Sequence, residues 1–418
     1  MTFNSLGLNE PLQRALMEIG YQSPTEIQQK AIPQILQQKE ILGTAQTGTG
    51  KTAAFALPII QKIDELKAQN SRSRDIQALI LSPTRELALQ IDENIRQYSK
   101  YTNVRHTVIY GGVNQNRQVK SLKRGVDILT ATPGRLLDLC QQGFINLKNI
   151  QFFVLDEADR MLDMGFIHDI RKIIQLIPEQ RQTLFFSATL PDNILKLSRS
   201  ILTNPVKIEV SPASPAADTV KQYLYYTNKK SKRDLLLHLL NDSIQEQVLL
   251  FSRTKHGANR IVRNLSRNKI KAAAIHGDRS QNQRQKALKD FKNGKVRVLV
   301  ATDIASRGID IDRLKYVINY DIPSESETYV HRIGRSGRAG EEGVAISISE
   351  PEENKYIRDI EALMDQKIEV IQENPFPQTE KPMTHAEKRA FNKEKERRRQ
   401  QFFKNRRKNK RRNKSSRS

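Results

Sequence analysis

Short apolar runs recur along the sequence, and each ends on a polar cluster, a glycine or a proline before a segment long enough for a helix. Near-continuous apolar strands separated by helix-length segments are typical of parallel sheets whose two faces are both covered. The pattern predicts two α/β domains in tandem, each with a parallel sheet. The runs lie at 78–81, 107–110, 126–129, 152–155 and 183–186 in the first half, and at 248–251, 272–275, 296–300, 317–320 and 344–348 in the second.

A segment with two prolines, small residues and little apolar content separates the two sets of runs. This composition is typical of a linker. We therefore predict a first domain at 1–208, a linker at 209–218, a second domain at 219–368 and a tail at 369–418. The length of 418 residues agrees with two or three domains.

The charge is concentrated at the end of the chain. The formal net charge is +24, and residues 381–418 contain 17 basic and three acidic residues, with Phe391, Phe402 and Phe403 among them. A segment this basic and this poor in aliphatic residues cannot bury a core, so we expect a disordered tail. Concentrated basic charge favours a polyanionic partner, most often nucleic acid. A solubilising tail and a basic localisation signal stay open as alternatives.

Several classes of protein are disfavoured. No apolar run approaches the roughly 20 residues of a membrane-spanning helix, and the N-terminus lacks the pattern of a signal peptide. The single cysteine, Cys140, excludes an internal disulfide and a cysteine-rich zinc module. We expect a soluble cytoplasmic protein without a membrane partner.

Polar residues and glycines follow most of the predicted strands. In open α/β sheets, ligands bind just beyond the carboxyl ends of the strands. One edge of each sheet is therefore expected to carry the function. The clusters concerned are 82–86, 111–112, 130–135, 156–159 and 187–189 in the first domain, and 252–254, 276–278 and 301–303 in the second.

Residues 45–52 have the spacing of a phosphate-binding P-loop, between a short apolar run and a helical segment. Backbone N–H groups of such a loop point at phosphates, the lysine reaches the terminal phosphates, and the last hydroxyl can ligate Mg²⁺. The first position is an alanine where glycine is common, which requires only a small side chain. The loop consists of Ala45, Gln46, Thr47, Gly48, Thr49, Gly50, Lys51 and Thr52.

Asp156 and Glu157 follow the apolar run at 152–155 and supply a second half of a nucleotide site. One carboxylate at such a strand end can hold Mg²⁺, and its neighbour can activate an attacking water. Two acids in this position are otherwise often a helix cap and its dipole partner. Because the P-loop is present, the nucleotide site is favoured.

Three arginines alternate with glycines at 331–338, late in the second domain. The planar guanidinium suits phosphate charge, so Arg332, Arg335 or Arg338 could act as an arginine finger on a nucleotide held by the other domain. A surface that contacts RNA and a cluster of salt bridges are the alternatives.

Together these motifs resemble those of the DEAD-box ATP-dependent RNA helicases of superfamily 2, with Asp156-Glu-Ala-Asp159 as the tetrapeptide that names the family. The resemblance covers about 1–350 and implies two RecA-like domains. The run 156–166, the insert-free core and the linker resemble the bacterial RhlE-like branch.

The resemblance assigns a nucleotide site. Segment 20–28 resembles the family's adenine-reading Q motif, in which Gln28 would hydrogen-bond adenine, so that ATP is the substrate. Mg²⁺ would be held by Thr52 and Asp156. The residues implied in nucleotide binding outside the P-loop are Phe3, Tyr21, Gln28 and Asp310, and those implied in catalysis are Lys51, Asp156, Glu157, Arg335 and Arg338.

The resemblance also assigns RNA contacts, which would grip phosphates and sugars with little sequence specificity. The implied RNA-binding residues are Thr84, Arg85, Gly111, Gly112, Thr132, Pro133, Gly134, Arg135, Arg253, Arg284 and Thr302. The residues expected to couple hydrolysis to unwinding are Asp159, Ser187, Ala188, Thr189 and His331.

We therefore expect an RNA-dependent ATPase that unwinds short RNA duplexes or remodels RNA–protein complexes, with structured RNA and ribonucleoprotein or ribosome-assembly complexes as partners. Two other functions stay open. One is a DNA helicase or translocase with the same paired domains, and the other is an RNA clamp or annealing protein in which ATP only sets a closed state.

Overall fold

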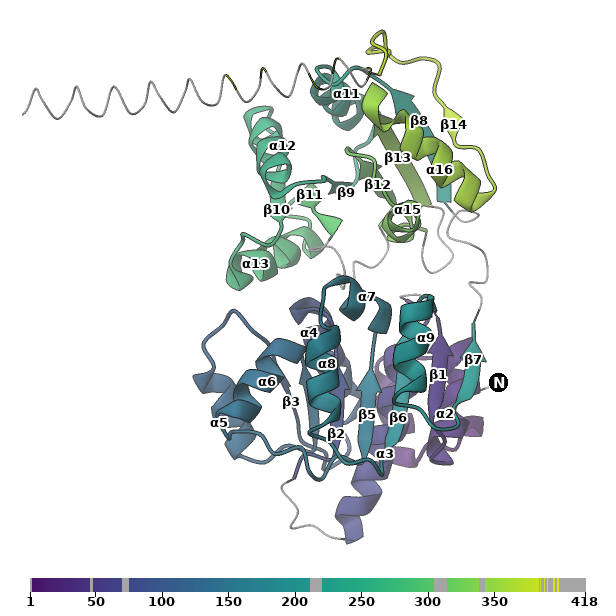
Figure 1. Cartoon of the computed structure of the whole chain (residues 1–418), viewed down its shortest axis with the longest axis vertical. Helices are drawn as coiled ribbons and strands as arrows, with labels where there is room; N and C mark the ends of the chain where they lie inside the picture. The colour runs from purple at the N-terminus through teal and green to yellow at the C-terminus, as the bar shows by residue number, and fades with distance from the viewer. Residues whose placement is uncertain are drawn as a thin grey trace, which may run out of the picture. The chain divides into compact units, whose positions relative to one another are not determined.

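The computed structural model describes residues 2–45, 48–69, 75–210, 220–303, 314–337 and 343–382, and single residues 384, 387, 389, 394 and 397. Its contacts divide the chain into two compact units, the first containing residues 1–219 together with 275–292, and the second containing most of the other residues from Val220 onward. Each unit holds a seven-stranded sheet with helices around it (Figure 1). The predicted fold class, two α/β domains with parallel sheets, is confirmed.

In the first unit the strand order is β3-β4-β2-β5-β6-β1-β7, and all neighbouring strands are parallel. The five apolar runs correspond to β2 to β6, whereas the edge strand β7 escaped prediction because it alternates apolar and charged residues. The strands are β1 (Ile41–Thr44), β2 (Ala78–Leu81), β3 (His106–Ile109), β4 (Ile128–Ala131), β5 (Phe152–Leu155), β6 (Gln182–Ser187) and β7 (Val206–Glu209).

Successive side chains of these strands enter two different hydrophobic cores, as the pleat of a strand requires. Ala78 and Ile80 of β2 pack in one core, while Leu79 and Leu81 pack in the other. The first core contains residues of η1 (Phe3–Leu6), α1 (Glu10–Glu18), α2 (Glu26–Leu36), α3 (Lys51–Gln69) and α4 (Arg85–Tyr98). The second contains residues of α6 (Pro133–Gln141), α7 (Ala158–Asp163), α8 (Ile167–Ile174) and α9 (Asp192–Arg199), with α5 (Asn116–Lys123) packed against it.

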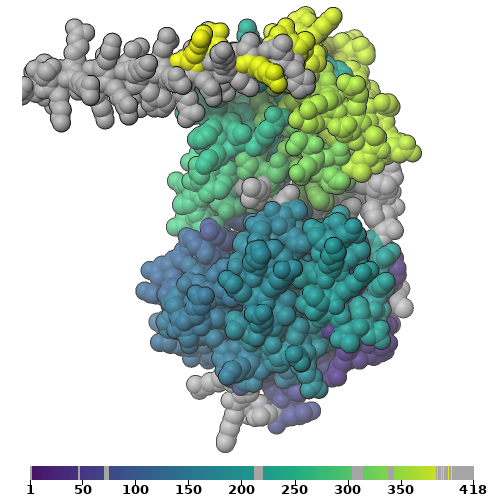
Figure 2. Space-filling model, viewed as in Figure 1, coloured from purple at the N-terminus to yellow at the C-terminus, as the bar shows by residue number. Residues whose placement is uncertain are grey.

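Helices α8 and α9 lie in front of the first sheet in the chosen view, and they form much of the teal surface of this unit (Figures 1 and 2). Both faces of the sheet are thereby closed. Its carboxyl edge, from which the P-loop and the other predicted loops emerge, is left for ligands.

The second unit repeats this architecture with the strand order β10-β11-β9-β12-β13-β8-β14. Its strands are β8 (Val220–Tyr226), β9 (Val248–Phe251), β10 (Ala272–Ile275), β11 (Val298–Ala301), β12 (Tyr316–Asn319), β13 (Gly343–Ser349) and β14 (Glu369–Val370). Its helical elements are α11 (Lys232–His238), the π-helical turn η2 (Leu239–Ser243), α12 (Lys255–Arg267), α15 (Ser326–Ile333), η3 (Pro351–Glu353) and α16 (Asn354–Met364). Helix α13 (Gln281–Lys292) follows β10 in the sequence, but its contacts group it with the first unit.

The second unit extends past residue 368, where the sequence placed the start of the tail. Strand β14 pairs with β8, and the following segment stays attached up to Glu380. Asn228 Oδ1 accepts hydrogen bonds from the backbone N–H groups of Thr379 and Glu380 at 3.0 and 2.9 Å, and Phe376 packs against the core. The second unit therefore extends to Glu380.

Among the described residues, no helix combines the length and apolar character needed to cross a bilayer.

Cys140 lies on α6 and is partly buried. Burial disfavours the charged thiolate and raises the pKa of Cys140 to about 11. The thiol is therefore protonated at neutral pH.

Candidate functional site

The P-loop connects β1 to α3 at the carboxyl edge of the first sheet. Gly48 and Gly50 have φ angles of 89° and 92°, in the left-handed region that glycine adopts without strain. A Cβ atom at Gly50 would also come within 2.4 Å of Gln28 Nε2. Both the conformation and the space therefore require glycine at position 50. Gln46 and Thr47 lie outside the described residues.

Lys51, the first residue of α3, is 6% exposed, and its Nζ donates a hydrogen bond to the Ala45 carbonyl at 2.6 Å. The ammonium group thus lies over the loop rather than in solvent. Thr52 follows it in the first turn of α3 and is partly buried. The two side chains that the sequence assigned to phosphate and Mg²⁺ therefore start at the same helix N-terminus.

Gln28 connects the P-loop to the start of α2. Its Nε2 donates to the Gly50 carbonyl at 3.1 Å, and its Oε1 accepts from the Thr25 N–H at 3.0 Å. The side chain is 3% exposed. Phe3 and Tyr21 form an aromatic pair with ring centroids 6.1 Å apart, and of the two only Tyr21 is exposed. The structure thus joins the segment resembling a Q motif to the P-loop through Gln28.

Asp156 follows β5 and is 2% exposed, and its Oδ1 has no hydrogen-bond partner among the described residues. The pKa of Asp156 is raised to about 7, mainly because burial disfavours the charged form; the charge of Lys51 opposes this rise, the Glu157 carboxylate adds to it, and Arg160 opposes it. A buried, unpartnered carboxylate oxygen is costly unless a ligand completes its coordination. This arrangement fits a divalent cation.

Glu157 occupies the left-handed region with a φ of 56°, at the residue before α7. This conformation is uncommon for residues other than glycine and often marks functional sites. Arg160, one turn later, donates from Nη1 to Glu157 Oε2 at 2.6 Å, and both side chains are buried. The sequence analysis did not single out Arg160. Its position three residues after Glu157 could have indicated an ion pair between the two side chains.

Asp159 brings the loop after β5 together with the loop after β6. Its Oδ2 accepts hydrogen bonds from the backbone N–H groups of Ala188 and Thr189 at 3.2 and 3.1 Å, and from the Thr189 hydroxyl at 3.2 Å. The Ser187 hydroxyl accepts from the Asp159 N–H at 3.3 Å. Four of the five residues assigned to coupling therefore form one hydrogen-bonded group. His331 lies in the second unit, on α15.

The residues assigned to RNA in the first unit follow the neighbouring strands β2, β3 and β4. Thr84 and Thr132 are the N-caps of α4 and α6. The Arg85 guanidinium lies against Gly112, where a Cβ atom would come within 2.4 Å of its Nη1. Arg135 donates from Nη1 to Gln118 Oε1 at 3.1 Å and from Nη2 to the Val113 carbonyl at 3.3 Å. Pro133 and Gly134 begin α6, and Gly111 precedes Gly112. The eight predicted residues share one edge of the sheet.

In the second unit, Arg253 follows β9 and Thr302 follows β11. Arg284 lies on α13, which is grouped with the first unit. Burial lowers the pKa of Arg284. Arg335 follows α15 and is 6% exposed. Asp310 and Arg338 lie outside the described residues.

Arg332, the first of the three alternating arginines, is used inside the second unit. It donates to both carboxylate oxygens of Asp303, at 2.6 and 2.9 Å, and its guanidinium lies 4.9 Å from the ring centroid of Phe251. It is 2% exposed. For Arg332, the structure supports the alternative of a salt-bridge cluster.

Two family models match the chain: DEAD/DEAH box helicase over residues 25–197, and Helicase conserved C-terminal domain over residues 231–340. The ATP-dependent RNA helicase CshA of Listeria monocytogenes is 43% identical over 370 residues, which cover 88% of this chain and 70% of that protein. CshA of Geobacillus kaustophilus is 41% identical over 368 residues, covering 88% and 78%.

Solved structures are similar along most of the chain. S. cerevisiae Dbp5 bound to RNA and ADP BeF3 matches with a TM-score of 0.78 and 31% identity, covering 88% of this chain and 95% of that one. A DEAD box protein from the hyperthermophile Methanococcus jannaschii matches with a TM-score of 0.52 and 40% identity, covering 89% and 99%.

Proposed function

This chain belongs to the DEAD-box family of ATP-dependent RNA helicases, and from that premise we propose that it uses RNA-dependent ATP hydrolysis to unwind short RNA duplexes or remodel RNA–protein complexes. The observation that carries the proposal is the edge of the first sheet where Lys51, Asp156 and Glu157 lie close to a P-loop. At this edge a phosphate-binding loop is combined with two buried carboxylates, those of Asp156 and Glu157.

In the proposed site, Ala45 to Lys51 bind the phosphates through backbone N–H groups and the ammonium of Lys51. The unpartnered Oδ1 of Asp156 and the hydroxyl of Thr52 are hard oxygen donors that fit Mg²⁺. When bound, Mg²⁺ would neutralise charge on the phosphate oxygens. Gln28 would recognise adenine, with Phe3 and Tyr21 beside it, and Asp310 would contact the ribose.

Glu157 would orient the attacking water and accept its proton. Its Oε2 is occupied by Arg160, so the carboxylate is held in one orientation. Groups aimed in advance at the transition state need little reorganisation during the reaction. Arg335 and Arg338 of the second unit would add positive charge to the phosphates, which makes turnover depend on both units.

RNA would be bound along its backbone by the eight residues at the edge of the first sheet, by Arg284 of α13, and by Arg253 and Thr302 of the second unit. The hydrolysis of the nucleotide would be coupled to RNA binding by five residues: Asp159, Ser187, Ala188, Thr189 and His331. RNA that binds both units would favour the conformation that is active in ATP hydrolysis. Stimulation of the ATPase by RNA would then be a shift in population toward this conformation.

Four further predictions, on domain boundaries, branch, location and partners, are part of this proposal. They are a first domain at 1–208 and a second that begins at 219, membership of the RhlE-like branch, action in the cytoplasm, and ribonucleoprotein or ribosome-assembly complexes as partners. The relatives described above carry the name CshA, so the branch stays a prediction. The basic residues of 381–418 would tether RNA, with a strong dependence of binding on salt.

A steady-state ATPase assay tests the proposal. The rate is measured without nucleic acid, with single-stranded and duplex RNA, and with DNA of the same sequence, for the wild type and Lys51→Ala. We expect RNA to stimulate the rate more than DNA and Lys51→Ala to lower it about 100-fold. Equal stimulation by DNA would favour the DNA helicase alternative. ATP binding without turnover would favour the clamp.

A further inference from the structure

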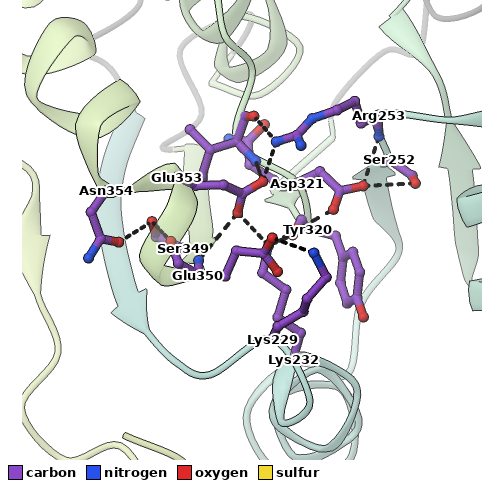
Figure 3. Close-up of polar contacts among 12 residues, drawn as sticks. Lys229, Lys232, Ser252, Arg253, Tyr320, Asp321, Ser349, Glu350, Glu353 and Asn354 are labelled. Atoms are coloured by element: carbon purple, nitrogen blue, oxygen red, sulfur yellow. Dashed lines mark hydrogen bonds and ion pairs between the residues drawn. The ribbon is translucent and has the colours of Figure 1, made fainter. Parts of the chain in front are cut away.

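A cluster of charged side chains joins three strand ends of the second unit (Figure 3). Arg253 follows β9, Asp321 follows β12, and Glu353 ends η3 after β13, while Lys232 begins α11. Figure 3 shows these side chains pointing toward one another from separate elements. Lys232 and Glu353 are 2% and 1% exposed, so their charges must be satisfied within the protein.

Glu353 is fully satisfied. Its Oε2 accepts from Lys232 Nζ at 2.5 Å and from the Glu350 N–H at 3.3 Å. Its Oε1 accepts from the Ile322 N–H at 3.2 Å and from Arg253 Nη2. Lys232 Nζ also lies 3.9 Å from Asp321 Oδ1, so the two cations Lys232 and Arg253 face the two acids Glu353 and Asp321. Within this balanced set of charges, the contact with Glu353 fixes the position of the Arg253 guanidinium.

Arg253 is fixed at both ends. Its backbone N–H donates to Asp321 Oδ2 at 2.8 Å, and its Nη2 donates to the Ile322 carbonyl at 2.9 Å as well as to Glu353. Yet half of the Arg253 side-chain surface is exposed. Among the described residues, the guanidinium makes its hydrogen bonds through Nη2, which leaves Nε and Nη1 for an external acceptor.

We propose that Glu353 is a positioning residue that holds the Arg253 guanidinium ready for a phosphate of the RNA backbone. The inference rests on the proposed function, in which Arg253 contacts RNA. A side chain fixed before binding loses less rotamer entropy when the contact forms, and hydrogen bonds between guanidinium and phosphate are among the strong ones.

The test uses the full chain and a fluorescently labelled single-stranded RNA, with Mg²⁺ and a non-hydrolysable ATP analogue. RNA affinity is measured by anisotropy for the wild type, Arg253→Gln, Glu353→Gln and the double variant. We expect each single change to weaken RNA binding about tenfold. Because both act through one contact, the double variant should bind no more weakly than Arg253→Gln.

Glu361→Gln is the matched control. Glu361 is also a largely buried acid of the second unit, accepting from Lys367 Nζ at 2.6 Å and the Ile368 N–H at 3.1 Å, and it makes no contact with Arg253. Its loss should leave RNA affinity unchanged.

Glu353→Asp covers the case in which Glu353→Gln does not fold. It retains the charge opposite Lys232 but is one methylene shorter and should lose the contact with Arg253. The RNA concentration for half-maximal ATPase should rise about tenfold while kcat at saturating RNA stays the same.

Wild-type RNA affinity in Arg253→Gln would refute the role of Arg253 in the proposed function. Weaker binding by Arg253→Gln with wild-type affinity in the Glu353 variants, or additive losses in the double variant, would overturn the inference about Glu353 alone.

Discussion

The two units each bury a carboxylate at the carboxyl edge of a parallel sheet, but they satisfy it differently. In the first unit, Asp156 Oδ1 has no partner among the described residues. In the second, the two oxygens of Glu353 accept from four donors. Since burying an unsatisfied charge is costly, the first arrangement indicates an external ligand and the second an internal support. Burial alone does not distinguish a binding residue from a structural one.

The neighbouring residues strengthen this contrast. Glu157 adopts a left-handed backbone conformation beside Asp156, whereas Glu353 has no such strain. Backbone strain and an unpartnered oxygen thus coincide in the first unit. The following changes convert acids to amides in both units, so that each compares the same chemistry in a different setting.

The largest effect is expected for Glu157→Gln. The amide keeps the size of the side chain but cannot accept the proton of water, so kcat should fall by about 100-fold or more while ATP affinity is retained. Steady-state ATPase at saturating RNA and binding of a fluorescent ATP analogue measure the two quantities. Glu361→Gln serves as control and should keep kcat. An unchanged RNA-stimulated rate in Glu157→Gln would remove the role assigned to it.

Asp156→Asn should separate stability from activity. Turnover should fall about 100-fold, because an amide oxygen is a poorer ligand for Mg²⁺ than a carboxylate. The nucleotide-free protein should nevertheless unfold at the same or a higher temperature, since a desolvated charge is removed. Thermal unfolding followed by circular dichroism measures this.

Asp127→Asn is the matched control for that change. Asp127 is fully buried in the same unit and accepts from Lys67 Nζ at 2.6 Å and Arg105 Nη2 at 3.0 Å. Burial raises the pKa of Asp127, but the hydrogen bonds of Arg105 and Lys67 outweigh it and the pKa is lowered. Its amide should destabilise the protein. If Asp156→Asn destabilised it equally, the contrast between unpartnered and partnered acids would be wrong.

A smaller effect, confined to stability and RNA binding, is expected for Glu353→Gln. Removing the buried acid takes away the nearer counter-charge of Lys232 and leaves it with Asp321 at 3.9 Å, which should lower the free energy of unfolding by roughly 3 kcal/mol. ATP affinity should not change. Chemical denaturation of the full chain and the fluorescent nucleotide assay check these points, and a loss of ATP affinity would contradict the separation of the two clusters.

The smallest effect is expected for Glu26→Gln, which breaks an exposed ion pair with Lys30 on α2. Exposed pairs four residues apart on a helix contribute below about 0.5 kcal/mol. Denaturation and ATPase assays should therefore give wild-type values. A clear loss of activity would show that position 26 contributes to the nucleotide site beyond this pair.

Local patterns in the sequence were sufficient for most central strands and for the P-loop, but they missed β8, in which buried residues alternate with exposed or partly exposed ones. Five apolar runs became β2 to β6, and the glycines of the P-loop adopt the conformations that its geometry requires. Edge strands were missed because they are short or half-exposed: β14 has only two residues, and β7 alternates apolar and charged positions.

Contacts distant in sequence were also beyond prediction. Glu353 lies 121 residues from Lys232 and 100 from Arg253, and no local spacing relates them. Arg332 is a second example of a role that local spacing does not determine. Its spacing suggested an arginine finger, whereas its hydrogen bonds to Asp303 give it a structural role. The pairing of buried charges depends on which strand ends the sheet order brings together.

The protonated thiol of Cys140 has a practical consequence for spectroscopy. Thiolates rather than thiols react with maleimides, so a pKa of about 11 leaves the protein's single cysteine slow to label at neutral pH. A cysteine introduced at exposed Lys148, in the loop that leads to β5, would then take a fluorophore selectively without prior removal of the native one. A second introduced cysteine in the other unit would allow distances between two dyes to be followed as ATP and RNA are added.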